Sequence, residues 1–202
     1  MGTTAEIRIE PFRPEMLTVA SRVLARAFVT NPLHVATFGA GQLAKNEAFF
    51  HHGLAVMKGP KLVALEGSRI LGVIHWVHSS ACQISGLEKL RLVPAMLGNF
   101  GPAGAVRVSR WLSTWSTHDP SEPHCHLGPI GVEPAAQGRH IGHALMERYC
   151  EELDRTGTAG YLETDRPKNV AFYRRFGFDV TSEVPLLGVR SYFMWRAARS
   201  SA

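Results

Sequence analysis

Apolar positions recur along the chain in two periods, every second residue in short runs and every third or fourth in longer ones. The first period predicts strands and the second predicts amphipathic helices. Before residue 78 the pattern gives strands over 7–9, 61–65 and 69–77, the last two joined as a hairpin through Glu66-Gly67-Ser68, and helices over 14–28 and 43–57. Asn31-Pro32 is interpreted as a break after the first helix.

The second half alternates helices with strands. The pattern predicts helices over 87–97, 103–115, 136–155 and 167–176, and strands over 125–132, 161–164, 178–184 and 189–195. Pro94 is expected to kink or shorten the first of these helices. This order indicates an α+β fold built on a mixed sheet. No linker divides the chain, so we expect one domain over 1–202, with 79–123 as a helical insertion.

Composition narrows the classes of function. The formal charge of +5 and pI near 9.4 suggest an anionic partner. The basic residues are scattered, which argues against nucleic acid. Cys82, Cys125 and Cys150 lie far apart with no Cys-x-x-Cys pair, so neither a disulfide framework nor a metal site is expected. Met1 to Glu6 shows no secretory signal, and no apolar run could span a membrane, so we expect a cytoplasmic protein.

The turn Gln137-Gly138-Arg139-His140-Ile141-Gly142 joins an apolar strand to a helix. The amides at a helix start and the helix dipole attract anions such as a pyrophosphate, and Arg139 could add a charge-assisted contact. Gly128-Pro129 in the preceding strand weakens pairing, so we expect a bulge or splay there. An ordinary strand-to-helix turn would also use the glycines at 138 and 142.

A second segment, Asn169 to Phe178, presents Asn169 and Tyr173 on one helix face. A phenol keeps its proton at neutral pH and can protonate a thiolate leaving group. On spacing alone, a tyrosine whose ring packs in the core is the favoured interpretation.

With both segments in view, the chain resembles the GNAT superfamily of N-acetyltransferases, well over 124–196 and by element order over 5–77. The resemblance implies a largely antiparallel sheet of about seven strands, splayed near Gly128-Pro129, with acetyl-CoA as acyl donor and no metal. It implies that Tyr173 acts as general acid. The residues that it places at the coenzyme are Ile130, Gly131, Val132, Gln137, Gly138, Arg139, His140, Ile141, Gly142, His143, Asn169 and Tyr173.

His140 stands where the family motif has its first glycine. We expect this position to keep a negative φ, which tolerates a Cβ. A crowded coenzyme site would instead favour a non-catalytic acyl-CoA-binding regulatory or interaction module. A purely structural domain is a third alternative.

The resemblance also implies a base that deprotonates a small-molecule or peptide amine, which then attacks the acetyl group directly in a ternary complex. His126 is the first candidate, and Glu163, His124 and His75 are the others. Residues 28–57 and 79–123 are expected to shape the acceptor site. A homodimer is compatible with the sequence.

Overall fold

The computed structural model describes residues 6–82 and 86–199. The first five residues, part of the segment examined for a secretory signal, lie outside this range. Seven strands form one sheet in the order β1-β2-β3-β4-β5-β7-β6, and each pair is antiparallel except β4 with β5. The strands are β1 (Ile7–Pro11), β2 (Lys61–Glu66), β3 (Arg69–His78), β4 (His124–Val132), β5 (Ala159–Thr164), β6 (Asp179–Leu186) and β7 (Val189–Arg196). The predicted mixed, largely antiparallel sheet is confirmed.

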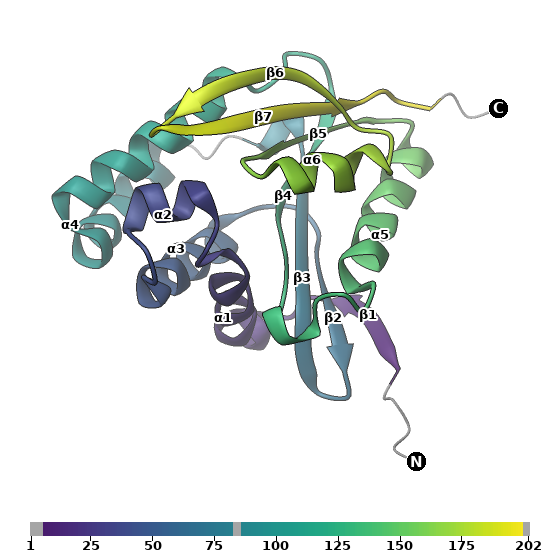
Figure 1. The fold of residues 1–202 in the computed structure, drawn as a ribbon, viewed down its shortest axis with the longest axis horizontal. Coiled ribbons are helices and arrows are strands. Elements are labelled where there is room, and N and C mark those ends of the chain that lie inside the picture. The colour runs from purple at the N-terminus through teal and green to yellow at the C-terminus, as the bar shows by residue number, and fades with distance from the viewer. Residues whose placement is uncertain (1–5, 83–85, 200–202) are drawn as a thin grey trace.

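Helices cover both faces of this sheet (Figure 1). They are α1 (Leu17–Phe28), α2 (Pro32–Phe38), α3 (Leu43–Val56), α4 (Gly86–Thr117), α5 (Ile141–Thr156) and α6 (Pro167–Arg174). Alternation along β2 divides the core, because Val63 packs with α1 and α3 whereas Ala64 packs with α5. The sheet is therefore closed on each side by a separate apolar cluster.

The sheet opens at Gly128-Pro129, as the sequence predicts. On the β3 side, Ile74 pairs with Ile130 and Trp76 with Leu127, so β4 holds one extra residue at this bulge. On the β5 side, the pairing runs from His124 only to His126, which lies opposite Tyr161. Beyond that point β4 and β5 diverge, and β5, β7 and β6 cross the end of the longer strands (Figure 1).

The helix α2 was not predicted. The sequence pattern predicts a break at Asn31-Pro32, but the Asn31 Oδ1 atom accepts hydrogen bonds from the amides of Leu33 and His34, at 3.1 and 3.2 Å. Asn31 is thus the N-cap of a new helix, and Pro32 occupies the first helical position, where its missing amide is harmless.

Three further expectations are corrected near the turn and the insertion. The helix expected from residue 136 begins at Ile141, after a 3₁₀ turn at Pro134–Ala136. His140 has φ 60° and ψ 9°, so the expected negative φ is wrong. Pro94 does not end its helix; α4 continues to a non-helical Gly101 (φ 67°, ψ 172°). Pro94 is exposed, so water can satisfy the carbonyl that lacks its amide partner.

The insertion packs α4 against α2 and α3. Trp111 is buried there and stacks on Phe49 with ring centroids 5.2 Å apart. Within the described residues, no helix combines the length and apolar character that crossing a membrane requires.

Candidate functional site

The turn before α5 leaves backbone amides free for a ligand. The first hydrogen bond of the helix runs from the Ala144 amide to the His140 carbonyl, at 3.0 Å. The amides ahead of Ala144 therefore have no partner inside the helix, and the helix dipole adds positive potential at the same point. Gly138 adopts φ 82°, and a Cβ built on it would meet no atom within 4 Å, so the turn presents open backbone.

A cleft of about 420 Å³ lies against this turn, between β4 and α6. Eleven of the twelve residues predicted to contact the coenzyme line it, namely Ile130, Gly131, Val132, Gln137, Gly138, His140, Ile141, Gly142, His143, Asn169 and Tyr173. Arg139 is the exception. Its guanidinium points to β2 and forms an ion pair with Glu66 at 2.6 Å, so its contact with an anion stays a prediction.

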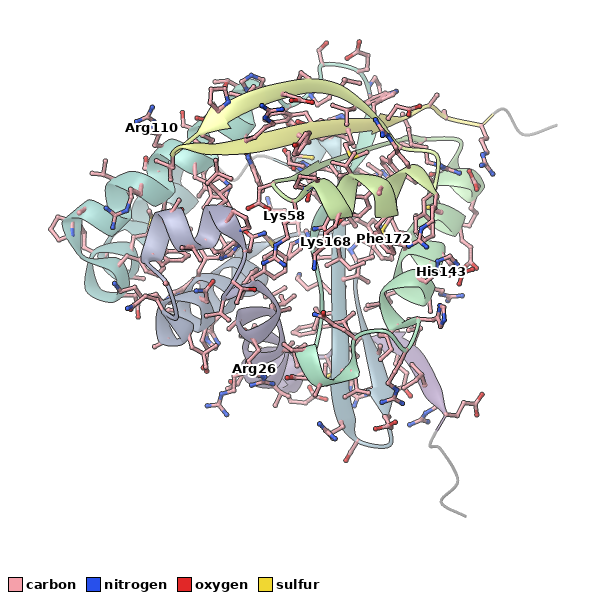
Figure 2. All side chains as sticks on the ribbon, viewed as in Figure 1. Arg26, Lys58, Arg110, His143, Lys168 and Phe172 are labelled. Atoms are coloured by element: carbon pink, nitrogen blue, oxygen red, sulfur yellow. The ribbon has the colours of Figure 1, made fainter. Side chains whose placement is uncertain are left out.

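Three basic residues of the cleft were not singled out from the sequence. Lys168 lines it from α6, and Arg166 and Arg175 line it from the residues just before and just after that helix. Figure 2 shows Lys168 and Phe172 on α6, and His143 on the neighbouring α5. Because these cations line the same cleft as the open amides, the cleft is suited to a polyanionic ligand. Only the spacing of Lys168 and Arg175 on one predicted helix could have indicated them.

Tyr173 stands at the inner end of the cleft. It lines both this cleft and a smaller inner cavity of about 120 Å³. Burial, and then the nearby Asp165 carboxylate, raises the pKa of Tyr173, so the phenol holds its proton at neutral pH. No hydrogen bond of the hydroxyl is found within residues 6–82 and 86–199, which leaves it available to a ligand.

Glu163 lines the inner cavity opposite β4, and its side chain is 2% exposed. One carboxylate oxygen, Oε2, lies 2.8 Å from His126 Nε2. The other, Oε1, is buried and accepts no hydrogen bond from the described part of the chain. A buried carboxylate oxygen without a partner is costly, so Oε1 is suited to accept a proton or an N–H donor from a bound molecule.

The three histidine candidates occupy different places. His126 contacts Glu163 but lines a separate apolar cavity of about 740 Å³ under α4. His124 is buried beside it, with Nδ1 2.8 Å from the Glu122 carbonyl. His75 is buried and donates from Nε2 to the Lys58 carbonyl, at 2.6 Å, and burial lowers the pKa of His75 to about 4. His75 lines none of these three cavities.

Asp165 connects the inner cavity to α2. Its carboxylate accepts hydrogen bonds from the Asn31 side chain and the Leu33 amide, each at 2.6 Å. Burial raises the pKa of Asp165, and these two donors act against that rise. The unpredicted helix α2 is thereby held at the edge of the inner cavity, which His34 also lines.

Comparison with known proteins agrees with this geometry. The sequence model of the acetyltransferase (GNAT) family matches residues 62–178. The chain belongs to the GNAT family. A mycothiol acetyltransferase of Mycobacterium sp. (strain JLS) is 43% identical over 61 residues, which are 26% of this chain and 20% of that protein. The match therefore spans about a fifth of the length of that relative.

Solved GNAT structures share the whole fold. A crystal structure described as histone acetyltransferase HPA2 and related acetyltransferase, from Corynebacterium glutamicum, superposes with TM-score 0.74 at 21% identity, over 97% of this chain and 98% of that one. A GNAT family acetyltransferase from Brucella melitensis, in complex with acetyl-CoA, gives TM-score 0.56 at 20% identity, over 98% and 92%. At these identities the likeness establishes the fold.

Proposed function

We propose that this protein transfers an acetyl group from acetyl-CoA to a primary amine by direct attack in a ternary complex. One observation carries the proposal: the divergence of β4 from β5 places the Tyr173 hydroxyl and the free Glu163 oxygen on one inner cavity, which adjoins the basic cleft. Glu163 can then accept a proton from the attacking amine, and Tyr173 can donate one to the leaving sulfur.

The residues of the cleft fit the coenzyme. The open amides at the start of α5 and the cations of α6 suit the pyrophosphate. The edge of β4 at Ile130, Gly131 and Val132 is unpaired on the β5 side and can bond an extended arm, as in strand addition. When bound, acetyl-CoA supplies an activated thioester carbonyl.

The chain's own groups then handle two protons. Glu163 Oε1 takes the proton that the amine must lose as the new C–N bond forms. Tyr173 gives its proton to the sulfur as the C–S bond breaks, and this prevents build-up of a free thiolate. His126 orients Glu163 through the 2.8 Å contact and leaves Oε1 toward the cavity. Glu163 therefore replaces His126 as our first choice of base, because it is the one that lines the inner cavity.

The test combines coenzyme-thiol release over an amine panel with two variants. We expect Tyr173→Phe and Glu163→Gln each to lower kcat on the order of a hundredfold, with the Kd for acetyl-CoA nearly unchanged by calorimetry. Tyr192→Phe and Glu183→Gln are matched controls, since neither residue lines the three cavities, and both should keep wild-type turnover.

Two results would decide against the proposal. Full turnover in Tyr173→Phe or Glu163→Gln would remove that residue from its role. Tight acetyl-CoA binding without thiol release from any amine would support the non-catalytic binding module instead.

A further inference from the structure

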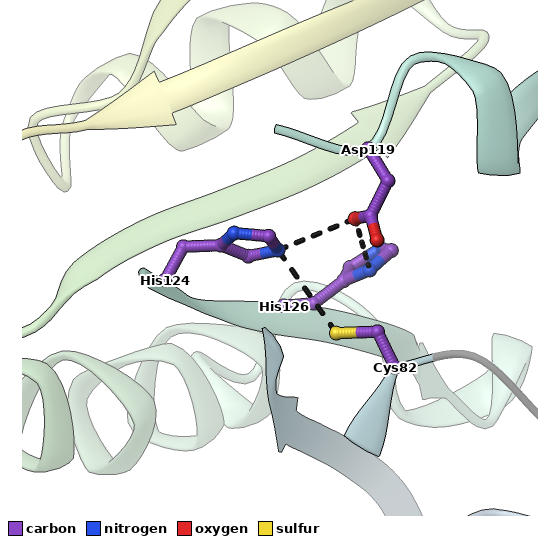
Figure 3. A group of neighbouring side chains, drawn as sticks. All are labelled: Cys82, Asp119, His124 and His126. Carbon is purple, nitrogen blue, oxygen red and sulfur yellow. Dashed lines mark hydrogen bonds and ion pairs between the residues drawn. The ribbon is translucent and has the colours of Figure 1, made fainter. Parts of the chain in front are cut away.

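Four potential metal ligands converge beside β4, outside the cleft and the inner cavity. Cys82 follows β3, Asp119 follows α4, and His124 and His126 lie on β4 (Figure 3). Their ligand atoms, Sγ, Oδ1, Nε2 and Nδ1 respectively, all lie within 4.8 Å of one another. Segments 37 residues apart in the sequence thus meet at one point, which the lack of a Cys-x-x-Cys pair concealed.

Three of the separations between the ligand atoms are close to those around a tetrahedral zinc ion. Zinc bonds of about 2.0–2.1 Å to nitrogen or oxygen and about 2.3 Å to sulfur place neighbouring ligand atoms roughly 3.3 to 3.6 Å apart. Here His124 Nε2 lies 3.3 Å from Asp119 Oδ1, and His126 Nδ1 lies 3.7 Å from the same oxygen. Cys82 Sγ lies 3.9 Å from His124 Nε2. These three separations exceed the tetrahedral values by at most a few tenths of an ångström, and the remaining pairs of ligand atoms lie within 4.8 Å.

Each histidine is also held in the orientation that a metal ligand needs. His124 Nδ1 contacts the Glu122 carbonyl at 2.8 Å, and a carbonyl can only accept, so Nδ1 carries the proton. In the neutral ring, Nε2 therefore presents its lone pair to Cys82 and Asp119. His126 repeats this arrangement, with Nε2 on the Glu163 carboxylate and Nδ1 turned inward. Carbonyl and carboxylate partners of this kind orient histidines around protein-bound metals.

We propose that Cys82, Asp119, His124 and His126 bind one Zn²⁺ ion. The four atoms each carry a lone pair that one cation can accept at a single point. A thiolate with two imidazoles and a carboxylate selects zinc over the hard cations Mg²⁺ and Ca²⁺. Four protein ligands complete the tetrahedron, which is typical of a structural site.

At this position a bound ion would have a structural role. Cys82 precedes α4 and Asp119 follows it, so the ion joins both ends of the insertion to β4. Cys82, Asp119 and His126 also line the apolar cavity under α4. Zinc would therefore fix the helix that covers this cavity, and this inference does not depend on the acetyl-transfer proposal.

The test measures metal binding rather than activity. Apo-protein titrated with Zn²⁺ should bind one equivalent per chain by elemental analysis after dialysis, and its unfolding midpoint should rise with Zn²⁺ but not with Mg²⁺. Co²⁺ in place of zinc should give the visible bands of a tetrahedral site and a near-ultraviolet thiolate-to-cobalt band. Cys82→Ser should lose the thiolate band and weaken zinc binding at least tenfold, whereas Cys150→Ser should retain both.

A second pair of variants distinguishes the loss of a zinc ligand from misfolding. Asp119→Asn should weaken zinc binding at least tenfold, while the exposed control His78→Gln should bind like wild type. Acetyl-CoA binding serves as the measure of an intact fold in each variant. Failure of wild-type protein to retain zinc, or equal binding by Cys82→Ser and Cys150→Ser, would overturn the proposal. The cluster would then be an ion-paired network of protonated histidines with Asp119 and Glu163.

Discussion

Replacing His140 with glycine should stabilise the protein. His140 is one of two residues other than glycine with positive φ in the described chain, and it stands in the turn that opens the coenzyme cleft. The left-handed conformation brings its Cβ close to the following carbonyl oxygen. Glycine has no Cβ and adopts this conformation without that contact.

The expected gain is a difference of two terms. A left-handed conformation costs an L-residue roughly 1–2 kcal/mol. Glycine offsets about 0.4–1 kcal/mol of this gain, because it gives the unfolded chain more conformational entropy, which is lost on folding. His140→Gly should therefore raise the free energy of unfolding by about 0.5–1 kcal/mol. No hydrogen bond from the His140 side chain caps α5, so its removal leaves no capping partner unsatisfied.

Urea denaturation of three proteins measures the effect. His140→Ala is the control, since it removes the imidazole but keeps the Cβ, and it should be less stable than His140→Gly by about 1 kcal/mol. Any change in the Kd for acetyl-CoA shared by both variants reports on the imidazole, and any difference reports on the backbone. If the two variants unfold at the same urea concentration, the strain argument is wrong.

Two further predictions concern stability and coenzyme affinity. Gly128→Ala should lower the free energy of unfolding, measured by urea denaturation, by about 2 kcal/mol, because the added Cβ would lie 2.3 Å from His75 Nδ1. The same loss in a His75→Ala background would show that this clash is not the cause. Arg139→Ala should leave the calorimetric Kd for acetyl-CoA nearly unchanged, since Arg139 pairs with Glu66, whereas Arg175→Ala should weaken it by about 1 kcal/mol. The reverse order would return Arg139 to the coenzyme.

Local backbone chemistry made most of the fold predictable. Glycine and proline in a strand disfavour regular pairing wherever they occur, so the bulge at Gly128-Pro129 followed from two residues. The turn from Gln137 to Gly142 was predictable for the same reason, because strand, glycines and amphipathic helix are adjacent in the sequence. Asn31-Pro32 shows the limit of such signals. The same pair suits both a break and a helix start, and the contacts of Asp165, 134 residues away, favour the start.

Side-chain convergence was much harder to predict. The number and spacing of cysteines excluded local metal motifs, yet Cys82 and Asp119 reach the β4 histidines only because α4 turns the chain back on itself. We prefer Glu163 to His126 as the base because the two side chains line different cavities. Alternation along a strand does not reveal this difference, since β4 and β5 separate after His126. Arg139 illustrates the same limit, since its ion pair with Glu66 joins residues 73 positions apart.

The bulge explains how one strand can serve two sites. Strand alternation would place Ile130 on the same face as His124 and His126 if β4 were regular. Instead Leu127 and Ile130, three residues apart, both pack on the cluster beneath α5, so the bulge reverses the alternation. The histidines before the bulge are left on the other face, toward Cys82 and Asp119, while the strand after it borders the coenzyme cleft. Gly128-Pro129 thus separates the proposed zinc site from the proposed acetyl-transfer site, and the contact between His126 and Glu163 joins them.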